Sequence, residues 1–329
     1  MKKKEDYICL SAMIHARETK LLTSEKCERM ISAPSVEEAA KILTDCGYED
    51  ISAMDAAGIN EALNAHRTAV FKELVQLCPE KNYLDIFAMR YDYHNAKVLI
   101  KAEAMNADAA ALMSDSGRFP AEKLRKLFYA GSTASLTAKF GCSLKEARQM
   151  LESTGNPQLA DFILDRAYFA EMAEAADGTQ NSFLQEYVRL LADCANLKSA
   201  VRTLRLKKGK AFLLDALNDS GSVRADRIAS ALSPDGILSV FGGTALSTAA
   251  ALGAEAAAGG TLTAFELACD NAVNAFLKKA RRVNYGSEPL TGYVAAVENE
   301  ITAVRMILTG RLAGVKSDVL RERLRDMYA

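Results

Sequence analysis

The sequence has few of the residues that break helices or mark metal sites. Its 329 residues include six prolines, three histidines and no tryptophan. Scarce proline and abundant Ala, Leu, Glu, Lys and Arg favour helix along the whole chain. The histidines, His15, His66 and His94, are never paired as HxxxH or HExxH, so the sequence predicts no zinc site of that kind.

An excess of charge of one sign is also missing. Lys plus Arg number 41 against 42 Asp plus Glu, which leaves a net charge of -1. Proteins that neutralise phosphate backbones carry a basic surplus, so we expect no nucleic-acid partner. Hydrophobic residues make up 50% of the chain and charged residues 25%, which is typical of a globular protein with real cores.

The seven cysteines form no metal-binding or redox pattern, because no two lie closer than 18 residues. We expect them to be reduced thiols in a cytosolic protein. No signal peptide is apparent, since the basic residues 2–4 are followed by acids. The stretch 242–262 is the most membrane-like, but its small residues and Glu255 make it too polar to span a bilayer, so we expect no membrane span.

Nucleotide and metal chemistry are equally unmarked. Gly242 and Gly243 belong to no GxxxxGK[ST] phosphate loop, and we interpret them as a turn. Two pairs of acids lie one helical turn apart: Asp161 with Asp165, and Glu266 with Asp270. Such pairs ligate metals in four-helix carboxylate sites, but those sites also need a Glu-x-x-His partner, which this chain lacks. We therefore predict no catalytic, cofactor or metal residues and favour a structural role for the pairs.

One short motif occurs three times: an acid, two residues, Asn, one residue and a base. Its members are Asp92, Asn95 and Lys97, then Asp193, Asn196 and Lys198, and in a looser copy Glu300, Ala303 and Arg305. On a helix the acid and the Asn share a face and the base lies further round. We interpret the Asn residues as locks that bond a neighbouring backbone or the acid. A catalytic interpretation would need perturbed groups in a pocket.

A second motif predicts a capped helix in two places. Ser35 begins one copy and Gly47 ends it, and Ser143 and Gly155 hold the same positions 108 residues later. Serine at the start, Glu three residues on and Gly at the end are typical helix start and stop signals.

A third motif is a loop that leads into a short helix with an acid in its first turn. We recognise it at 117–124, at 221–228 and, as a weaker copy, at 315–320. The order of motifs predicts three helical repeats, residues 1–113, 114–217 and 218–329. No third-motif copy is recognised before Tyr7, so we expect residues 315–324 to supply it and residues 316–329 to pack near residues 7–22.

Helical periodicity dominates between these motifs. Phe71, Leu74, Val75 and Leu77, for example, are predicted to line one face of a helix. Alternation of the strand type never persists beyond five or six residues. The predicted fold class is all-α.

The C-terminal segment resembles the closing motif of a family found in V/A-type rotary ATPases, the C subunits, which are called d in eukaryotes. The matching residues are Pro289, Tyr293, Glu298, Glu300, Ile301, Arg305, Ile307, Gly310 and Arg311. The segments 91–97 and 233–236 are similar to two further family motifs, so the resemblance spans about residues 7–325. Val297 and Ala303 depart from the pattern, which puts the polar lock of the third repeat in doubt.

The resemblance implies a funnel of three similar helical domains around a pseudo-threefold axis. It implies a non-catalytic central-stalk socket that couples the rotor shaft, formed by the D and F subunits, to a membrane rotor ring of small lipid-soluble subunits. Such a socket would lie at the cytoplasmic side, peripheral to the membrane, and would support ATP-linked proton or sodium transport. It would need no cofactor.

Two other functions remain open from the residues. A helical-repeat scaffold or adaptor for an unrelated partner would share the repeats but would need no fixed number of them. A helical enzyme would have to build its site from Asp161, Asp165 and nearby groups, and metal binding by the pure protein would reveal it.

Overall fold

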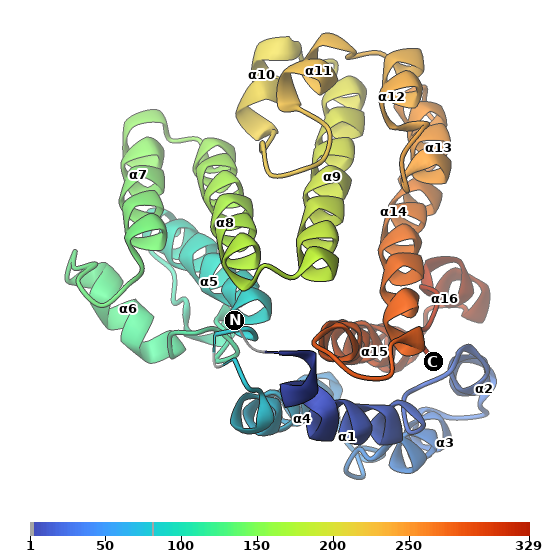
Figure 1. Ribbon diagram of the computed structural model, residues 1–329. Coiled ribbons are helices and arrows are strands. Elements are labelled where there is room, and N and C mark those ends of the chain that lie inside the picture. The colour runs from blue at the N-terminus through green and yellow to red at the C-terminus, as the bar shows by residue number, and fades with distance from the viewer. Residues whose placement is uncertain (1–2, 81) are drawn as a thin grey trace. The chain divides into compact units, whose positions relative to one another are not determined.

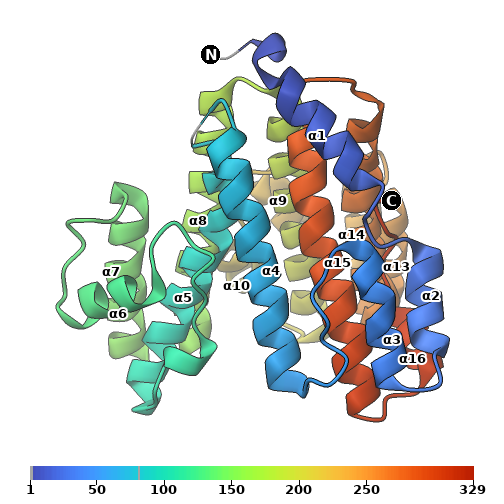
Figure 2. The same ribbon diagram turned by 90° about the horizontal axis from the view of Figure 1, so that it is seen from below.

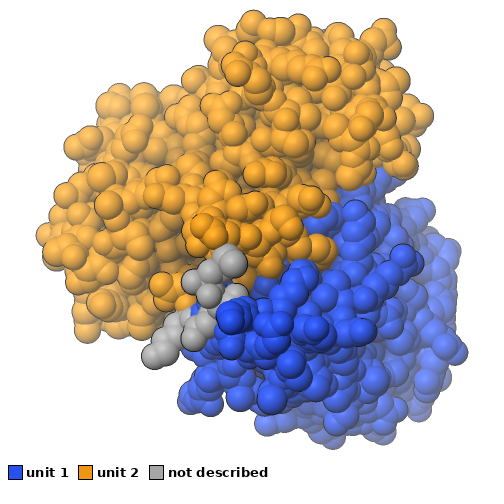
Figure 3. Space-filling view, viewed as in Figure 1, with its two compact units in different colours: residues 1–81, 261–329 blue, residues 82–260 orange. Residues whose placement is uncertain are grey.

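A computed structural model describes residues 3–80 and 82–329, and over these ranges the chain forms helices and no strand. The predicted all-α class is confirmed. The chain divides into two compact units (Figures 1 and 3). Unit 1 joins residues 1–81 to residues 261–329, and unit 2 is the continuous segment 82–260. Both ends of the chain therefore belong to the same unit.

Unit 1 is built around the long helix α15 (Glu288–Leu312), which contacts helices from the start of the chain. Figure 2 shows α4 running alongside α15, with α1 crossing near the start of α15. The other elements are η1 (Lys4–Tyr7), α1 (Ile8–Glu18), α2 (Ser24–Ser32), α3 (Val36–Lys41), η2 (Ile42–Cys46), α4 (Ala56–Leu77), α14 (Leu262–Leu277), η4 (Lys278–Arg282) and α16 (Ser317–Arg323).

Unit 2 repeats this plan around two long helices, α5 (Asp85–Met105) and α9 (Ser182–Arg205). Helix α5 packs against the three helices that follow it, and α9 packs against α8 and the helices after itself. The remaining elements are η3 (Ala110–Leu112), α6 (Ala121–Tyr129), α7 (Ala138–Thr154), α8 (Pro157–Thr179), α10 (Lys210–Ala216), α11 (Ala225–Ser230), α12 (Pro234–Phe241) and α13 (Ser247–Ala257).

The predicted capped helices are correct in one copy and partly wrong in the other. Ser35 is the N-cap of α3, and its hydroxyl accepts a hydrogen bond from the Glu38 N–H at 3.2 Å. Ser143 instead lies buried inside α7 and donates to the Phe140 carbonyl at 3.0 Å. The N-cap of α7 is Thr137. By Ser143 the helix is already formed, and its backbone N–H groups are paired within the helix, so none is left to donate to the Ser143 hydroxyl. Gly155 ends α7 in the left-handed conformation, as expected.

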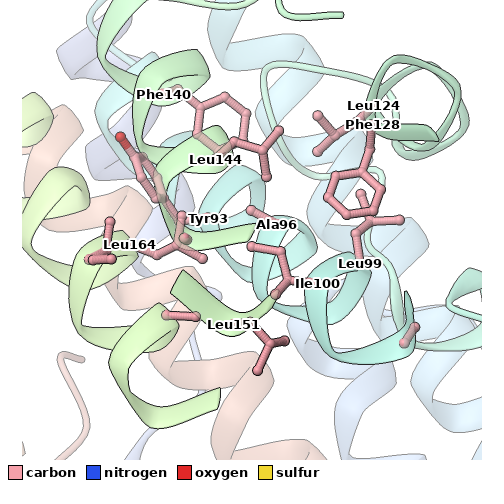
Figure 4. Packing of buried hydrophobic residues seen from close by; sticks show 14 of the residues in the cluster. Tyr93, Ala96, Leu99, Ile100, Leu124, Phe128, Phe140, Leu144, Leu151 and Leu164 are labelled. Atoms are coloured by element: carbon pink, nitrogen blue, oxygen red, sulfur yellow. The ribbon is translucent and has the colours of Figure 1, made fainter. Parts of the chain in front are cut away.

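An apolar core joins α5, α6, α7 and α8 in unit 2. Figure 4 shows Tyr93 of α5 beside Phe140 of α7, and their ring centroids are 4.9 Å apart. Leu99 of α5 is buried with Leu124 and Phe128 of α6. This core fixes α6 against α5, the helix that carries the first repeated acid.

Candidate functional site

The three acids of the repeated motif occupy the middles of α5, α9 and α15 and are all buried. The exposed fraction is 0% for Asp92, 4% for Asp193 and 3% for Glu300. A buried carboxylate is costly unless hydrogen-bond donors surround it. The donors that each acid finds therefore define what the motif does.

Asp92 holds the loop that leads into α6. Its Oδ1 accepts from the Phe119 N–H at 3.2 Å, and its Oδ2 accepts from Arg118 Nε at 2.6 Å. Phe119 immediately precedes Pro120, the N-cap residue of α6. The carboxylate thus pairs a backbone donor in the loop, one residue before the N-cap of the helix.

Asp193 repeats this contact on α11. Its Oδ1 accepts from the Val223 N–H at 3.1 Å, and its Oδ2 accepts from the N–H of Ser222 at 3.1 Å and from the Ser222 hydroxyl. Val223 immediately precedes Arg224, the N-cap residue of α11. A hydroxyl here replaces the guanidinium that faces Asp92.

Glu300 makes the third copy of the contact with a segment from the start of the chain. Its Oε2 accepts from the Leu22 N–H, and its Oε1 accepts from the Tyr48 hydroxyl at 2.7 Å. Leu22 immediately precedes Thr23, the N-cap residue of α2. Helix α2 therefore stands to α15 as α6 stands to α5. We call these three contacts the carboxylate locks.

The third lock corrects the sequence analysis. The missing copy of the loop-and-helix motif is residues 20–32, within repeat one, and the weaker match at 315–320 belongs to α16, a different element. The copy was missed because Lys20 stands where the other two have Gly117 and Gly221. The match of Ser24-Glu-Lys to Ala121-Glu-Lys was the available signal.

The length of the acid accounts for the glycine pattern. A Cβ on Gly117 would lie 2.3 Å from Asp92 Oδ1, and one on Gly221 would lie 2.2 Å from Asp193 Oδ1. Neither glycine has a positive φ, so close approach and not backbone conformation requires it. At the third lock the acid is a glutamate, which is one methylene longer, and Lys20 stands where the other loops carry glycine.

The two Asn residues of the motif support the same loops. Asn95 donates to the Ser114 carbonyl and accepts from the Ser114 N–H, both at 2.8 Å. Asn196 pairs in the same way with Asn218, at 2.8 and 3.0 Å. Ala303 has no side-chain group for such a pair. The Asn contact is therefore a feature of unit 2.

Two bases of the motif, Lys97 and Arg305, contact a neighbouring long helix. Lys97 Nζ lies 2.6 Å from Asp165, and Lys101 Nζ lies 2.7 Å from Asp161. Arg305 of α15 donates to Asn60 of α4 at 2.7 Å and to Asn64 at 3.3 Å. Lys198 is half-buried on α9. The acid pair of α8 thus binds lysines of α5.

An ion network that the sequence did not reveal surrounds the first lock. Arg118 bridges Asp92 and Glu171, whose Oε1 it approaches to 2.8 Å. Glu171 also accepts from the hydroxyls of Tyr93 and Thr137, at 2.8 and 2.7 Å. Because 53 residues separate Arg118 from Glu171, no local pattern signals the pair. The network joins α5, α7 and α8 to the loop before α6.

The electrostatics of the two acids differ. Burial raises the pKa of Asp92 to about 6, although Arg118 opposes the shift. Burial would also raise the pKa of Glu171, but hydrogen bonds from Arg118, Thr137 and Tyr93 outweigh it and lower that pKa. Arg118 therefore sits between one carboxyl whose pKa is lowered, Glu171, and one whose pKa is raised, Asp92.

The C-terminal tail lies against the first two helices within unit 1. The Tyr328 hydroxyl donates to Glu18 of α1 at 2.8 Å. Arg321 pairs with Glu28 of α2 at 2.6 Å, and Arg311 donates to the Ala33 carbonyl at 2.6 Å. These contacts and the Glu300 lock hold the two ends of the chain together.

The described residues contain no cluster of three or more His, Cys, Asp or Glu side chains able to hold a metal ion. Across residues 3–80 and 82–329, no helix combines the length and apolar character needed to cross a bilayer. The carboxylate locks therefore have a structural role: each fixes the start of a short helix against a long helix.

The chain is similar to known proteins over almost its whole length. Residues 10–323 match the family described as ATP synthase (C/AC39) subunit. The chain is 24% identical to the C subunit of the V-type sodium ATPase of Enterococcus hirae, over 98% of this chain and 99% of that protein. It is 26% identical to the C subunit of the A-type ATP synthase of Methanocaldococcus jannaschii, over 97% of this chain and 86% of that protein.

Proposed function

The chain belongs to the ATP synthase (C/AC39) subunit family, and from that premise we propose that it is a non-catalytic central-stalk socket. It couples the rotor shaft to the membrane rotor ring of a V/A-type ATPase or ATP synthase. The observation that carries the proposal is the carboxylate lock, made three times and the third time between the two ends of the chain.

A socket that passes torque must not open under load, and the locks suit that task. A buried carboxylate bonded to a helix start resists sliding, because each displaced donor would be left unpaired in a dry interior. The sequence repeats are 1–113, 114–217 and 218–329, and the acid of each locks the first short helix of the next. Since Glu300 locks α2 of the first repeat, the series closes on itself. Three domains around a pseudo-threefold axis are the arrangement we propose for this closed series.

The proposed partners are the D and F subunits of the shaft and the ring of small lipid-soluble subunits. The protein would lie on the cytoplasmic side of the membrane as a peripheral part of the complex. It would serve ATP synthesis or ATP-driven ion transport without binding the ion. The relative from Enterococcus hirae is named as a subunit of a sodium ATPase. In the complex proposed for this chain, the rotor ring and not the socket would determine which ion is transported.

The test is a binding experiment with purified components. We expect the chain to bind the isolated rotor ring and the D–F shaft at the same time, and to link them when they do not bind each other. Calorimetry should show no saturable ATP binding at micromolar concentrations. Binding to neither component would overturn the socket and favour the scaffold. Binding of ATP or of a catalytic metal with turnover would favour the enzyme.

A further inference from the structure

The short turn η4, which follows α14 in unit 1, carries positive charge that no neighbouring acid in the sequence balances. Its four bases are Lys278, Lys279, Arg281 and Arg282. Residues 278–287 include no acid. All four side chains are exposed, and in the described part of the chain none of them forms an ion pair with an acid. Unbalanced bases of this kind create a positive potential at the surface. We call these four residues the basic turn.

The helical geometry of η4 groups the four charges. A 3-10 helix has three residues per turn, so side chains three positions apart lie on the same face. Lys278 therefore shares a face with Arg281. Lys279 shares the next face with Arg282. Ala280, in the middle of the turn, is fully buried and anchors it to the fold. The charges thus lie side by side on the outside of one short element.

Contacts within unit 1 hold the basic turn in place. Arg281 donates to the Tyr328 carbonyl at 3.2 Å. Val283 directly follows the turn, and its carbonyl lies 3.0 Å from Nε2 of His15 on α1. Figure 1 shows the end of α14 close to the C-terminus of the chain. The charges are therefore displayed on a fixed part of the surface.

The other two repeats carry no such charge at this place. The ten residues at the same distance before the acid of the carboxylate lock are 70–79 and 171–180. Together these two segments hold four acids and a single base, Lys72. Since the same long helix follows in all three repeats, the fold does not require bases here. The charge of the third repeat therefore points to a partner.

An exposed aromatic residue indicates what kind of partner the basic turn fits. Tyr285 lies three positions after Arg282 and is 43% exposed. Tyrosine combines an apolar ring with a polar hydroxyl and is enriched where membranes meet water. Clusters of four or more Lys and Arg beside a membrane attract anionic headgroups. Nucleic acid is a poorer match, because the whole chain has a net charge of -1.

We propose that the basic turn binds the headgroups of anionic lipids at a membrane surface, with Tyr285 at the level of the headgroups. The attraction is between exposed charges, so it needs no groove. Headgroups are mobile and interchangeable, so such contacts hold the chain near the surface without fixing its rotation. This inference rests on the proposed function for the place of the chain beside a membrane, and it names a partner other than the shaft and the ring.

The experiment measures binding of the full chain to lipid vesicles by flotation, with neither ring nor shaft present. Vesicles of phosphatidylcholine alone are compared with vesicles that also hold about 30% phosphatidylserine, whose headgroup is anionic. The variant of the basic turn combines Lys278→Gln, Lys279→Gln and Arg282→Gln. Arg281 is kept because it bonds the Tyr328 carbonyl.

A matched control variant removes the same number of positive charges from unit 2. It combines Lys207→Gln, Lys208→Gln and Lys210→Gln, and the side chains it replaces are also exposed. A third variant, Lys278→Arg with Lys279→Arg, keeps the charge of the basic turn. Melting temperature and helicity establish that each variant is folded.

We expect the parent to bind the vesicles that contain phosphatidylserine and not those of phosphatidylcholine alone. The variant of the basic turn should bind roughly a hundredfold more weakly, because each base contributes about fivefold, while the control should stay within about twofold of the parent. The arginine variant should bind as the parent does. Raising the ionic strength from about 0.05 M to about 0.5 M should abolish the binding.

Three results would overturn the assignment. Failure of the parent to bind the anionic vesicles at low salt would remove lipid as the partner, and the proposed function would stand if the same protein binds ring and shaft. Equal losses in the basic-turn variant and the control would show a general effect of net charge. If the basic-turn variant loses the D–F shaft and keeps its vesicle binding, the turn belongs to an acidic face of the shaft.

Discussion

The Asp locks of unit 2 and the Glu300 lock of unit 1 make the same contact with different residues. In unit 2 a short acid meets a loop that carries glycine, and in unit 1 a longer acid meets a loop that carries Lys20. The length of the acid and the residue in the facing loop differ together. A repeated contact can therefore survive the loss of both residues that would identify it in sequence.

The two kinds of lock also differ in charge. Asp92 faces the guanidinium of Arg118, whereas Glu300 accepts hydrogen bonds from two uncharged groups, the Leu22 N–H and the Tyr48 hydroxyl. Burial raises the pKa of Glu300, and those two donors oppose the shift. The lock that joins the chain ends depends on hydrogen bonds, and the first lock of unit 2 depends on an ion network.

The largest effect should follow from removing the Glu300 carboxylate. Glu300→Ala leaves two buried donors unpaired, so we expect a loss of about 3 kcal/mol in the free energy of unfolding. Denaturant unfolding followed by circular dichroism measures it. Glu300→Gln, which keeps one acceptor oxygen, should lose less. Equal unfolding midpoints for Glu300→Ala and the parent would show that unit 1 does not need its lock.

The Asn contact should matter less, and only in unit 2. Asn196→Leu removes the side chain that bonds both backbone groups of Asn218, so roughly 1–3 kcal/mol of stability should be lost. Asn95→Leu should behave alike because Ser114 is held in the same way. If both variants have the same melting temperature as the parent, the Asn residues are not structural and a surface role has to be considered.

The smallest effect is the contribution of the first lock to the pH dependence of stability. Since the folded-state pKa of Asp92 is about 6 against an ordinary value of 3.8, the folded protein binds a proton between these values that the unfolded chain does not. Stability from this group therefore rises as pH falls from 7 to 5, by roughly 1 kcal/mol. The rise should be absent from Asp92→Asn, while the contribution of Glu300 is common to both proteins. Parallel pH profiles for parent and variant would contradict the assignment.

Much of the fold could be predicted from the sequence, because helix signals are local. The cap at Ser35 and the stops at Gly47 and Gly155 follow from backbone chemistry within a few residues. Which side chains of a helix are buried was predicted less well. In α4, Leu74 is buried as expected, but Val75 and Leu77 are exposed. Leu77 lies three positions after Leu74 at the end of α4, where packing and not periodicity decides which residues are covered.

The locks could be predicted only in part, because they join distant segments. The acids and Asn residues were found by repetition, but Arg118 and Glu171 carry no repeated signal. The partner of Glu300 lies 278 residues away, at Leu22. Such contacts depend on how helices pack, and a single sequence does not state that.

The most direct test of the lock is a double-mutant cycle between Asp92 and Gly117. Gly117→Ala should cost roughly 1–3 kcal/mol in the parent, because the new methyl group meets the carboxylate. Gly178→Ala, in open space on α8, is the matched control and should cost nothing. If the lock is as described, the cost of Gly117→Ala falls to within about 0.5 kcal/mol of zero in an Asp92→Ala background. Costs that simply add in the double variant would contradict the account.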